Sequence, residues 1–263
     1  MALYKEIDIA SAKPTQKERG KIPHFGIDVI DVDTSFNVAL FIDLYKEAEF
    51  FCKKQNLNLI IVGGTGFYLK TLMEGISEFP KIDEKVKEKI KDQMSDLKKA
   101  YTFLSEIDPL YAKKLKPTDR YRIEKALTIF YQTDIAPTLY FKNNPPKPIL
   151  TDLTLFEISI DKDLLNSRIE QRTQEMFEMG LIDEVANIEF KYTRAPNPMK
   201  AIGIKEVLDY FDGKYNLNIT KEKITIHTRQ LAKRQRTFNK TQFPPHFKGR
   251  ADEIKDRVKK LLS

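Results

Sequence analysis

A short apolar run that leads into a glycine-rich turn constrains the fold of this chain more than any other feature. The run Leu57–Val62 is rich in β-branched residues, and Gly63, Gly64 and Gly66 follow it directly. Such a run is typical of a buried parallel strand, and the glycines permit a tight turn that a Cβ atom would obstruct. Helical spacing precedes the run at Phe36–Gln55 and follows the turn. The pattern of helix, strand and helix predicts an α/β sheet with crossover helices.

A helical insertion is predicted to interrupt this sheet. Amphipathic stretches fill residues 82–148, and the run Pro145–Pro148 ends them as a stiff boundary. A second apolar run, Leu153–Ile160, predicts another core strand, and Asp161 is expected to cap a helix that runs to Gly180. We therefore expect an α/β core with a parallel sheet at 1–81 and 149–263, and a helical insertion domain at 82–148.

Basic residues gather in the last fifth of the chain. The formal charge is only +7, from 45 Lys and Arg against 38 Asp and Glu, which suits a solvated surface. Residues 220–240, however, hold a single acid, Glu222, and these basic residues: Lys221, Lys223, Arg229, Lys233, Arg234, Arg236 and Lys240. This local asymmetry favours an anionic partner, of which nucleic acid is the commonest.

A helix over 224–240 would separate this charge from an apolar face. Its apolar stripe would consist of Ile224, Leu231 and Phe238. Nearly opposite this stripe would lie Arg229, Lys233, Arg236 and Lys240. Such a helix suits a phosphate backbone, although an ordinary solvated face is equally compatible with the pattern.

Other features restrict the class of protein. No apolar run approaches the roughly 20 residues that span a membrane, and charged residues occur too early for a signal sequence. Cys52 is the only cysteine, and His24, His227 and His246 stand too far apart for a zinc motif. These features predict a cytoplasmic protein without a membrane segment and without metal-binding side chains.

The glycine turn is the first candidate site. Backbone N–H groups in a strand-to-helix turn can hold an anion or let a ligand approach closely, although many such turns only connect two elements. The turn is not a Walker A loop. No G-x-x-x-x-G-K-[ST] occurs in the sequence, because the two GK pairs are followed by Ile22 and Tyr215.

A pair of arginines is the second candidate. Arg168 and Arg172 are four residues apart, so their guanidinium groups leave the same face of the predicted helix and could clamp a diphosphate. The alternative is a surface helix in which Glu170 and Glu175 are their ion-pair partners. Spacing alone favours this second interpretation.

Taken together, several segments resemble the ordered motifs of tRNA dimethylallyltransferases. They follow one another in the family's order, and they span nearly the whole chain: Tyr4–Thr15, Ile60–Ser77, Asp119–Leu127, Arg168–Val185, Lys200–Glu206 and Thr228–Phe238. The resemblance implies a P-loop-kinase-like core with a helical insertion that grips the anticodon stem-loop. It also implies the partners tRNA and dimethylallyl diphosphate, the cofactor Mg²⁺ and a monomeric protein.

The resemblance assigns roles to particular residues. Thr65, in the channel turn Gly63, Gly64 and Gly66, would contact the tRNA near the reacting adenine, and Arg172 would bind the diphosphate. The residues that would contact tRNA lie in four places: Lys87; Tyr121, Arg122, Ile123, Glu124 and Lys125; Lys200, Ala201, Ile202, Gly203, Ile204 and Lys205; and Lys233, Arg234, Gln235, Arg236, Thr237, Phe238, Asn239 and Lys240.

The sequence departs from the family pattern at its first residues. The family has a P-loop and a strand ending in Asp-Ser before the segment that matches Tyr4, and these 263 residues contain neither. Ile204 and Phe238 stand where the family usually has Tyr and Trp. We expect dimethylallyl transfer to N6 of the adenosine 3′ of the anticodon, impaired in this polypeptide. The alternatives are a noncatalytic RNA-binding remnant and a small-molecule phosphotransferase.

Overall fold

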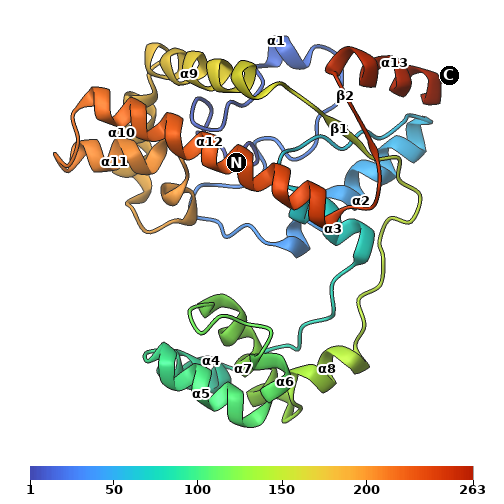
Figure 1. The fold of residues 1–263 in the computed structure, drawn as a ribbon, viewed down its shortest axis with the longest axis vertical. Helices are drawn as coiled ribbons and strands as arrows, with labels where there is room; N and C mark the ends of the chain where they lie inside the picture. Colours follow the sequence, from blue (N-terminus) through green and yellow to red (C-terminus); the bar gives the residue numbers. More distant parts are fainter. Residues whose placement is uncertain (263) are drawn as a thin grey trace. The chain divides into compact units, whose positions relative to one another are not determined.

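The computed structural model describes residues 1–262, which form two compact units (Figure 1). The first unit contains Met1–Lys70 and the chain from Asp152 onward, and the second is Thr71–Thr151. The helix α3 (Gly66–Glu74) crosses the boundary between them. The second unit takes in more of the chain than the predicted insertion at 82–148, because the segments on either side of the insertion bond to each other. Both Ile149 N and Leu150 N donate to Leu72 O at 2.9 Å.

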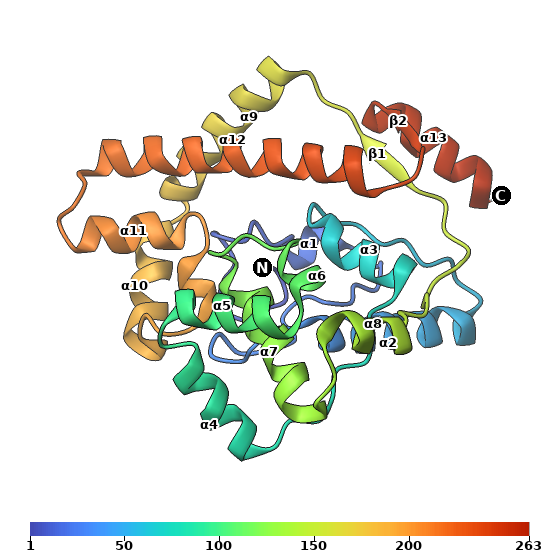
Figure 2. The same cartoon turned by 60° about the horizontal axis from the view of Figure 1, so that its bottom comes forward.

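The first unit is mainly helical. Its helices are α1 (Gln16–Arg19), α2 (Val38–Gln55), α9 (Lys162–Glu178), α10 (Leu181–Tyr192), η1 (Asn197–Lys200), α11 (Ile204–Phe211), α12 (Leu217–Gln242) and α13 (Ala251–Leu262). Figure 2 shows α12 as one long helix with α11 running beside it. The predicted helices at 36–55 and 224–240 are confirmed as α2 and α12.

A small parallel sheet joins two distant segments of the first unit. The strand β1 (Phe156–Ile158) pairs with β2 (Phe247–Gly249), with Phe156 opposite Phe247. The helix α13 lies against both strands (Figure 1). The predicted fold class, helices with a parallel sheet and a separate helical unit, is confirmed. The predicted strand Leu153–Ile160 is confirmed only over its central three residues.

The other predicted strand, Leu57–Val62, is wrong. The segment has no regular secondary structure and belongs to no sheet, and its apolar side chains are largely in solvent, with Ile60 59% and Val62 89% exposed. A strand exists only through hydrogen bonds to a neighbouring strand, and within the described residues no segment pairs with this one. The composition of the segment favours a strand, but it does not specify which neighbouring strand would pair with it.

The core of the first unit is therefore built by helices and by the first 32 residues. Tyr4, Ile7 and Val32 pack with buried residues of α9 to α12, which include Leu181, Ile204 and Ile224. The caps follow the sequence closely at the start of α9, where the Asp161 carboxylate accepts from Asp163 N and Leu164 N. At its other end α9 stops at Glu178, and Met179 is its C-cap rather than the expected Gly180. Gly180, with a φ of 98°, is instead the N-cap of α10.

The second unit has its own apolar centre. Its helices are α4 (Glu84–Gln93), α5 (Leu97–Ile107), α6 (Pro109–Ala112), α7 (Arg120–Thr133) and α8 (Pro137–Asn143). Buried side chains of α4, α5 and α7, among them Met94, Leu104, Ile123 and Leu127, form one cluster. A unit with its own core can keep its internal geometry independently of the rest of the chain.

Candidate functional site

The glycine turn packs directly against the last part of α12. A Cβ atom on Gly64 would come within 2.8 Å of Gln235 Nε2, and one on Gly66 within 2.8 Å of Phe238 Cδ1. Such distances are too short for real contacts, so a side chain at either position would require Gln235 or Phe238 to shift. Lys70 Nζ also donates to Gln242 Oε1 at 2.6 Å. The structure thus brings together two predicted sites, the channel turn with Thr65 and the strip Lys233–Lys240.

The opposite side of α12 carries the basic residues, and it is narrower than predicted. Lys233, Arg236 and Lys240 are exposed. Arg229 instead forms an ion pair with Glu170 of α9, so an acid does interrupt the predicted basic face. The sequence pattern missed this acid because Glu170 lies 59 residues away along the chain. We keep the term basic strip for Lys233, Arg236 and Lys240.

Of the three residues in the predicted apolar stripe of α12, only one is buried. Ile224 is buried, but Leu231 is 37% exposed and Phe238 is half-buried. The part of α12 that follows Thr225 contains no fully buried residue. Its later inward-facing residues meet the glycine turn, so they are not required to be apolar.

The arginine pair lies on α9, next to the face through which this helix packs against α12. Ile169, Thr173 and Met176 of α9 are buried, and Thr225 Oγ1 of α12 lies 3.3 Å from Thr173 Oγ1. Arg168 and Arg172 are exposed and make no hydrogen bond or ion pair with the described residues. The ion pairs expected in the alternative interpretation are absent from the described part of the chain, because Glu170 pairs with Arg229 and Glu175 accepts from Gln171, but the exposure of both arginines agrees with a surface helix.

The helix α9, which carries Arg172, and the glycine turn contact different parts of α12. The α9 contact is at Thr225 and the turn contact is at Gln235, ten positions further on. A helix rises about 1.5 Å per residue, so about 15 Å of α12 separates the two contacts. The structure places both candidate catalytic residues, Thr65 and Arg172, along one helix but does not bring them into contact.

The segment Lys200–Lys205 is only partly available to a ligand. Gly203 and Ile204 are buried, whereas Lys200 and Lys205 are exposed. The buried Glu206 holds the segment in place, since its carboxylate accepts from Gly203 N at 2.7 Å and lies 2.6 Å from His227 Nδ1 of α12. Gly203 has a φ of 95°, which other residues rarely adopt.

Three of the candidate residues of the helical unit, Lys87, Glu124 and Lys125, line a groove between α4 and α7. Its volume is about 280 Å³, and the residues that line it are Ile82, Lys87, Ile90, Lys91, Met94, Arg120, Glu124, Lys125 and Thr128. Tyr121 is 71% exposed and Arg122 lies 3.6 Å from Asp119, but Ile123 is completely buried. Lys87 pairs with Glu84 at 2.5 Å, and Lys125 Nζ lies 4.6 Å from the centre of the Phe79 ring.

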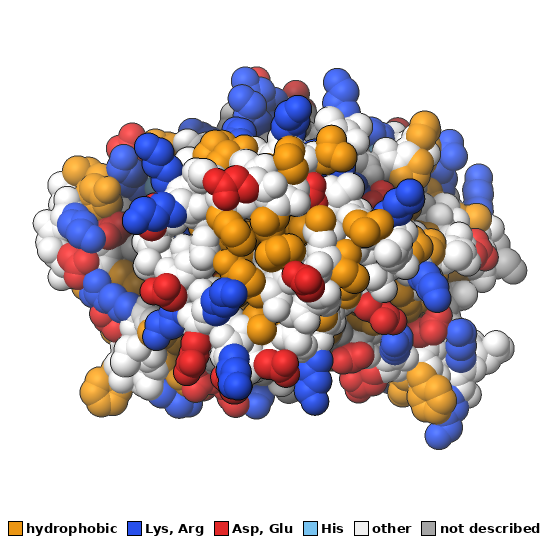
Figure 3. All heavy atoms as spheres, turned by 90° about the horizontal axis from the view of Figure 1, so that it is seen from below, with side chains coloured by type: hydrophobic (Ala, Val, Ile, Leu, Met, Phe, Trp, Pro, Cys, Tyr) orange, Lys and Arg blue, Asp and Glu red, His pale blue; other side chains and the backbone are white. Residues whose placement is uncertain are grey.

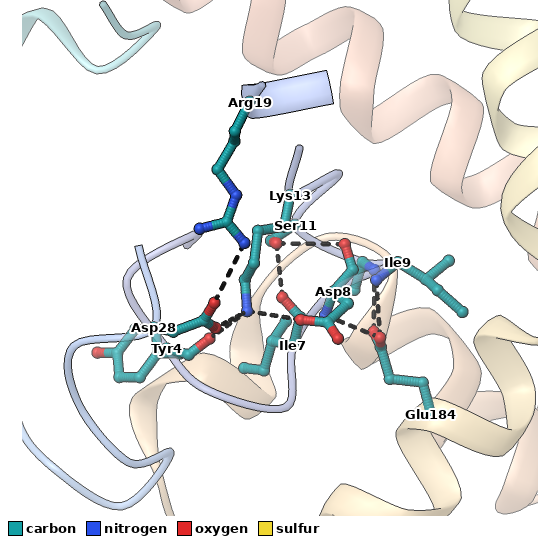
Figure 4. A network of polar contacts seen from close by, with 10 residues as sticks. Tyr4, Ile7, Asp8, Ile9, Ser11, Lys13, Arg19, Asp28 and Glu184 are labelled. Carbon is teal, nitrogen blue, oxygen red and sulfur yellow. Dashed lines mark hydrogen bonds and ion pairs between the residues drawn. The ribbon is translucent and has the colours of Figure 1, made fainter. Parts of the chain in front are cut away.

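The motif Tyr4–Thr15 has a structural role that local sequence patterns did not reveal. The Glu184 carboxylate of α10 accepts hydrogen bonds from Asp8 N, Ile9 N and Ala10 N at 2.7–2.9 Å (Figure 4). Lys13 bridges Asp8 and Asp28 at 2.6 and 2.5 Å. Burial opposes the charge of Lys13, but its hydrogen bonds to both carboxylates outweigh this cost and raise its pKa. These contacts tie the first residues to the helical core.

Charge and apolar side chains are distributed unevenly over the surface. On the face shown in Figure 3, apolar side chains gather at the centre and charges of both signs surround them. No helix within residues 1–262 combines the length and the apolar character needed to cross a membrane. The same residues contain no group of three or more His, Cys, Asp and Glu side chains that could hold a metal ion.

Comparison with known proteins gives one consistent result. A sequence profile of the IPP transferase family matches residues 2–242. The chain is 52% identical to a tRNA dimethylallyltransferase of Sulfurovum sp. (strain NBC37-1), over 97% of this chain and 85% of that protein. It is 50% identical to a tRNA dimethylallyltransferase of Nautilia profundicola, over 98% and 87% of the two chains.

Solved structures agree with the sequence comparisons. The crystal structure of a tRNA isopentenylpyrophosphate transferase from Bacillus halodurans matches with a TM-score of 0.69 and 26% identity, over 99% of this chain and 84% of that one. A eukaryotic dimethylallyltransferase acting on tRNA matches with a TM-score of 0.79 and 26% identity, over 91% and 61%. Because the profile and the relatives cover nearly all of these residues, the chain belongs to the IPP transferase family.

Proposed function

We propose that this protein transfers a dimethylallyl group from dimethylallyl diphosphate to the exocyclic N6 amine of the adenosine immediately 3′ of the anticodon in tRNAs. The observation that carries the proposal is the contact between the glycine turn and α12, where Gly64 and Gly66 meet Gln235 and Phe238. It supports a site in which the turn that bears Thr65 packs against one side of α12 while the basic strip lies on the other side of the same helix.

The reaction places clear demands on such a site. The lone pair of the adenine amine is delocalised into the ring, so the base must leave its stack and lose a proton as it attacks. A bond forms between N6 and the allylic carbon while the bond from that carbon to the diphosphate oxygen breaks. The leaving diphosphate gains negative charge, which cationic groups must stabilise.

The candidate residues can be matched to these demands. Thr65 is exposed at the turn and would contact the tRNA near the amine. Arg172, without a partner among the described residues, would hold the diphosphate with its two parallel N–H donors. Lys200 and Lys205, the exposed ends of their segment, would supply its contacts to the RNA, together with the basic strip.

The domain roles follow the same proposal. Residues 82–148, as a helical insertion between the core segments 1–81 and 149–263, would grip the anticodon stem-loop through Lys87 and Tyr121–Lys125. The groove between α4 and α7 supports this, because Lys87, Lys91, Arg120 and Lys125 line it together with one acid, Glu124. We propose further that the protein acts in the cytoplasm as a monomer.

Mg²⁺ does not fit a site built from side chains alone. The described residues offer no cluster of acidic side chains or histidines that would hold it. Mg²⁺ is commonly bound through the phosphates of a substrate and keeps several of its waters. As the proposed cofactor it would accompany the diphosphate.

We also propose that the polypeptide of these 263 residues binds tRNA but transfers little by itself. Its sequence has no Walker A motif, and Leu57–Val62 has no strand partner among the described residues. The same observations favour the noncatalytic RNA-binding alternative.

One experiment distinguishes the two functions. The 263-residue polypeptide, and the same chain supplied with the family's P-loop segment before Met1, would each be incubated with tRNA and labelled dimethylallyl diphosphate. We expect label on the target adenosine only with the supplied chain, and tRNA binding with both. Full turnover by the shorter polypeptide would refute its impairment. Binding without transfer by the supplied chain would favour the RNA-binding alternative.

A further inference from the structure

Two carboxamide side chains of α12 face the glycine turn. Gln235 and Asn239 are four residues apart and therefore lie on the same side of the helix. A Cβ atom on Gly64 would lie 2.8 Å from Gln235 Nε2, and one on Gly66 would lie 3.0 Å from Asn239 Oδ1. Both side chains are half-buried. Their polar ends therefore lie at the turn rather than in open solvent.

Neither carboxamide has a hydrogen-bond partner within residues 1–262, although other glutamines of the same unit do. Gln171 and Gln174 donate to Glu175 and Glu178, and Gln242 accepts from Lys70. Each carboxamide has two N–H donors and one carbonyl acceptor. Because no other described side chain occupies these donors and acceptors, they are available to a ligand.

An aromatic ring completes this surface. Phe238 lies between the two carboxamides in sequence, and its ring covers Gly66. The ring is held by Phe243, with centroids 6.0 Å apart and the rings at 74°. A half-buried ring beside hydrogen-bonding groups is the arrangement that proteins use to hold an unstacked base.

The hydrogen-bonding groups at this surface match adenine better than guanine. A carboxamide can accept from the N6 amine while it donates to the adjacent ring nitrogen, and this pairing is the usual contact between Asn or Gln and adenine. Guanine carries an acceptor, O6, in place of the amine.

We infer that Gln235 and Asn239 determine specificity for adenine by binding the amine-bearing edge of the base, with Phe238 against its face. The inference rests on the proposed function. It adds a division of roles within α12, in which the basic strip binds phosphates and the side facing the turn recognises the base. Recognition at the amine would also bring the nucleophile to the turn that carries Thr65.

Binding of anticodon stem-loops to the 263-residue polypeptide tests this division. The probes are fluorescent stem-loops that carry adenine, purine (which lacks the amine), guanine or 7-deazaadenine at the target position. The unaltered protein should bind the adenine loop about tenfold more tightly than the purine and guanine loops. Equal affinity for all four loops would overturn the inference without requiring any variant to fold.

Variants locate the effect. Gln235→Met combined with Asn239→Leu keeps side-chain size and removes the hydrogen bonds, so the preference for adenine should fall to about one. The matched control is Gln230→Met, an exposed glutamine of the same helix, which should keep the full preference. A uniform loss for every loop would show that the carboxamides only support the turn. If no loop binds the unaltered protein, the proposed function itself is wrong.

Discussion

At the residue scale, Arg172 gives the sharpest test of the proposed chemistry. Its guanidinium is exposed and has no partner among the described residues, and Arg168 provides a matched control one helical turn away. In a chain supplied with the family's P-loop segment, Arg172→Ala should raise the Michaelis constant for dimethylallyl diphosphate and lower turnover. Removing one charge-assisted hydrogen bond costs roughly 1.5–3 kcal/mol, about ten- to a hundredfold in kcat/KM.

The controls for Arg172 separate donor binding from RNA binding. Arg172→Lys should recover only part of the loss, because an ammonium group lacks the two parallel donors of arginine. Arg168→Ala should leave the Michaelis constant for the diphosphate substrate near its original value. If Arg172→Ala instead weakens tRNA binding and leaves the kinetics with dimethylallyl diphosphate unchanged, the residue belongs to the RNA surface.

At the element scale, one carboxylate of β1 bridges to β2 and to the residue just before it. Glu157 of β1 lies 2.9 Å from both His246 Nε2 and Lys248 Nζ. Burial opposes its charge, but the hydrogen bonds from Lys248 and His246 outweigh this and hold its pKa below the ordinary 4.5. A lowered carboxyl pKa stabilises the fold above the unfolded-state value, and the stabilisation is lost as pH falls through the lower, folded-state pKa.

Glu157→Gln should therefore lower the melting temperature at neutral pH. The difference from the unaltered protein should shrink as pH falls below about 4.5, where the unfolded carboxyl is already protonated. Thermal unfolding followed by circular dichroism, from about pH 3 to about pH 7, would measure this difference in melting temperature. Glu170→Gln, which removes a more exposed carboxylate paired with Arg229, is the control and should have a smaller effect. A constant difference at every pH would exclude the ion pair as the cause.

At the scale of the whole molecule, RNA binding should draw on both units. Lys233→Ala and Arg236→Ala remove charge from the basic strip of the first unit, and Lys91→Ala and Arg120→Ala remove it from the groove of the second. Each pair should weaken stem-loop binding and reduce the log–log salt slope by about one for each phosphate that is no longer neutralised. Because the sites lie in different compact units, the effects of combining them should be additive.

Binding titrations over a range of salt concentrations would check this additivity. Lys98→Ala combined with Lys113→Ala, which removes two exposed lysines of the second unit outside the groove, should leave the slope unchanged. If the groove variants also leave affinity and slope unchanged, the groove is an ordinary solvated surface. The same result for the basic strip would remove the main support for RNA binding by α12.

The sequence by itself determined the features that depend on neighbouring residues. Helical spacing and a capping aspartate predicted α2, α12 and the start of α9, because helix hydrogen bonds close within four residues. The glycine turn was identified for the same reason, since a missing Cβ acts locally. The ordered motifs also indicated the family, because they record residue identity along the chain.

Only the tertiary structure decided the features that require two distant segments. Leu57–Val62 has the composition of a strand but no partner among the described residues, and Arg229 was predicted to belong to the basic face but pairs with Glu170. Gln235 and Asn239 were expected in a strip that contacts tRNA, and only the fold showed that they lie against Gly64 and Gly66. The physical reason is common to all these cases. Pairing, ion pairs and close packing depend on distance in space, which spacing along the chain does not specify.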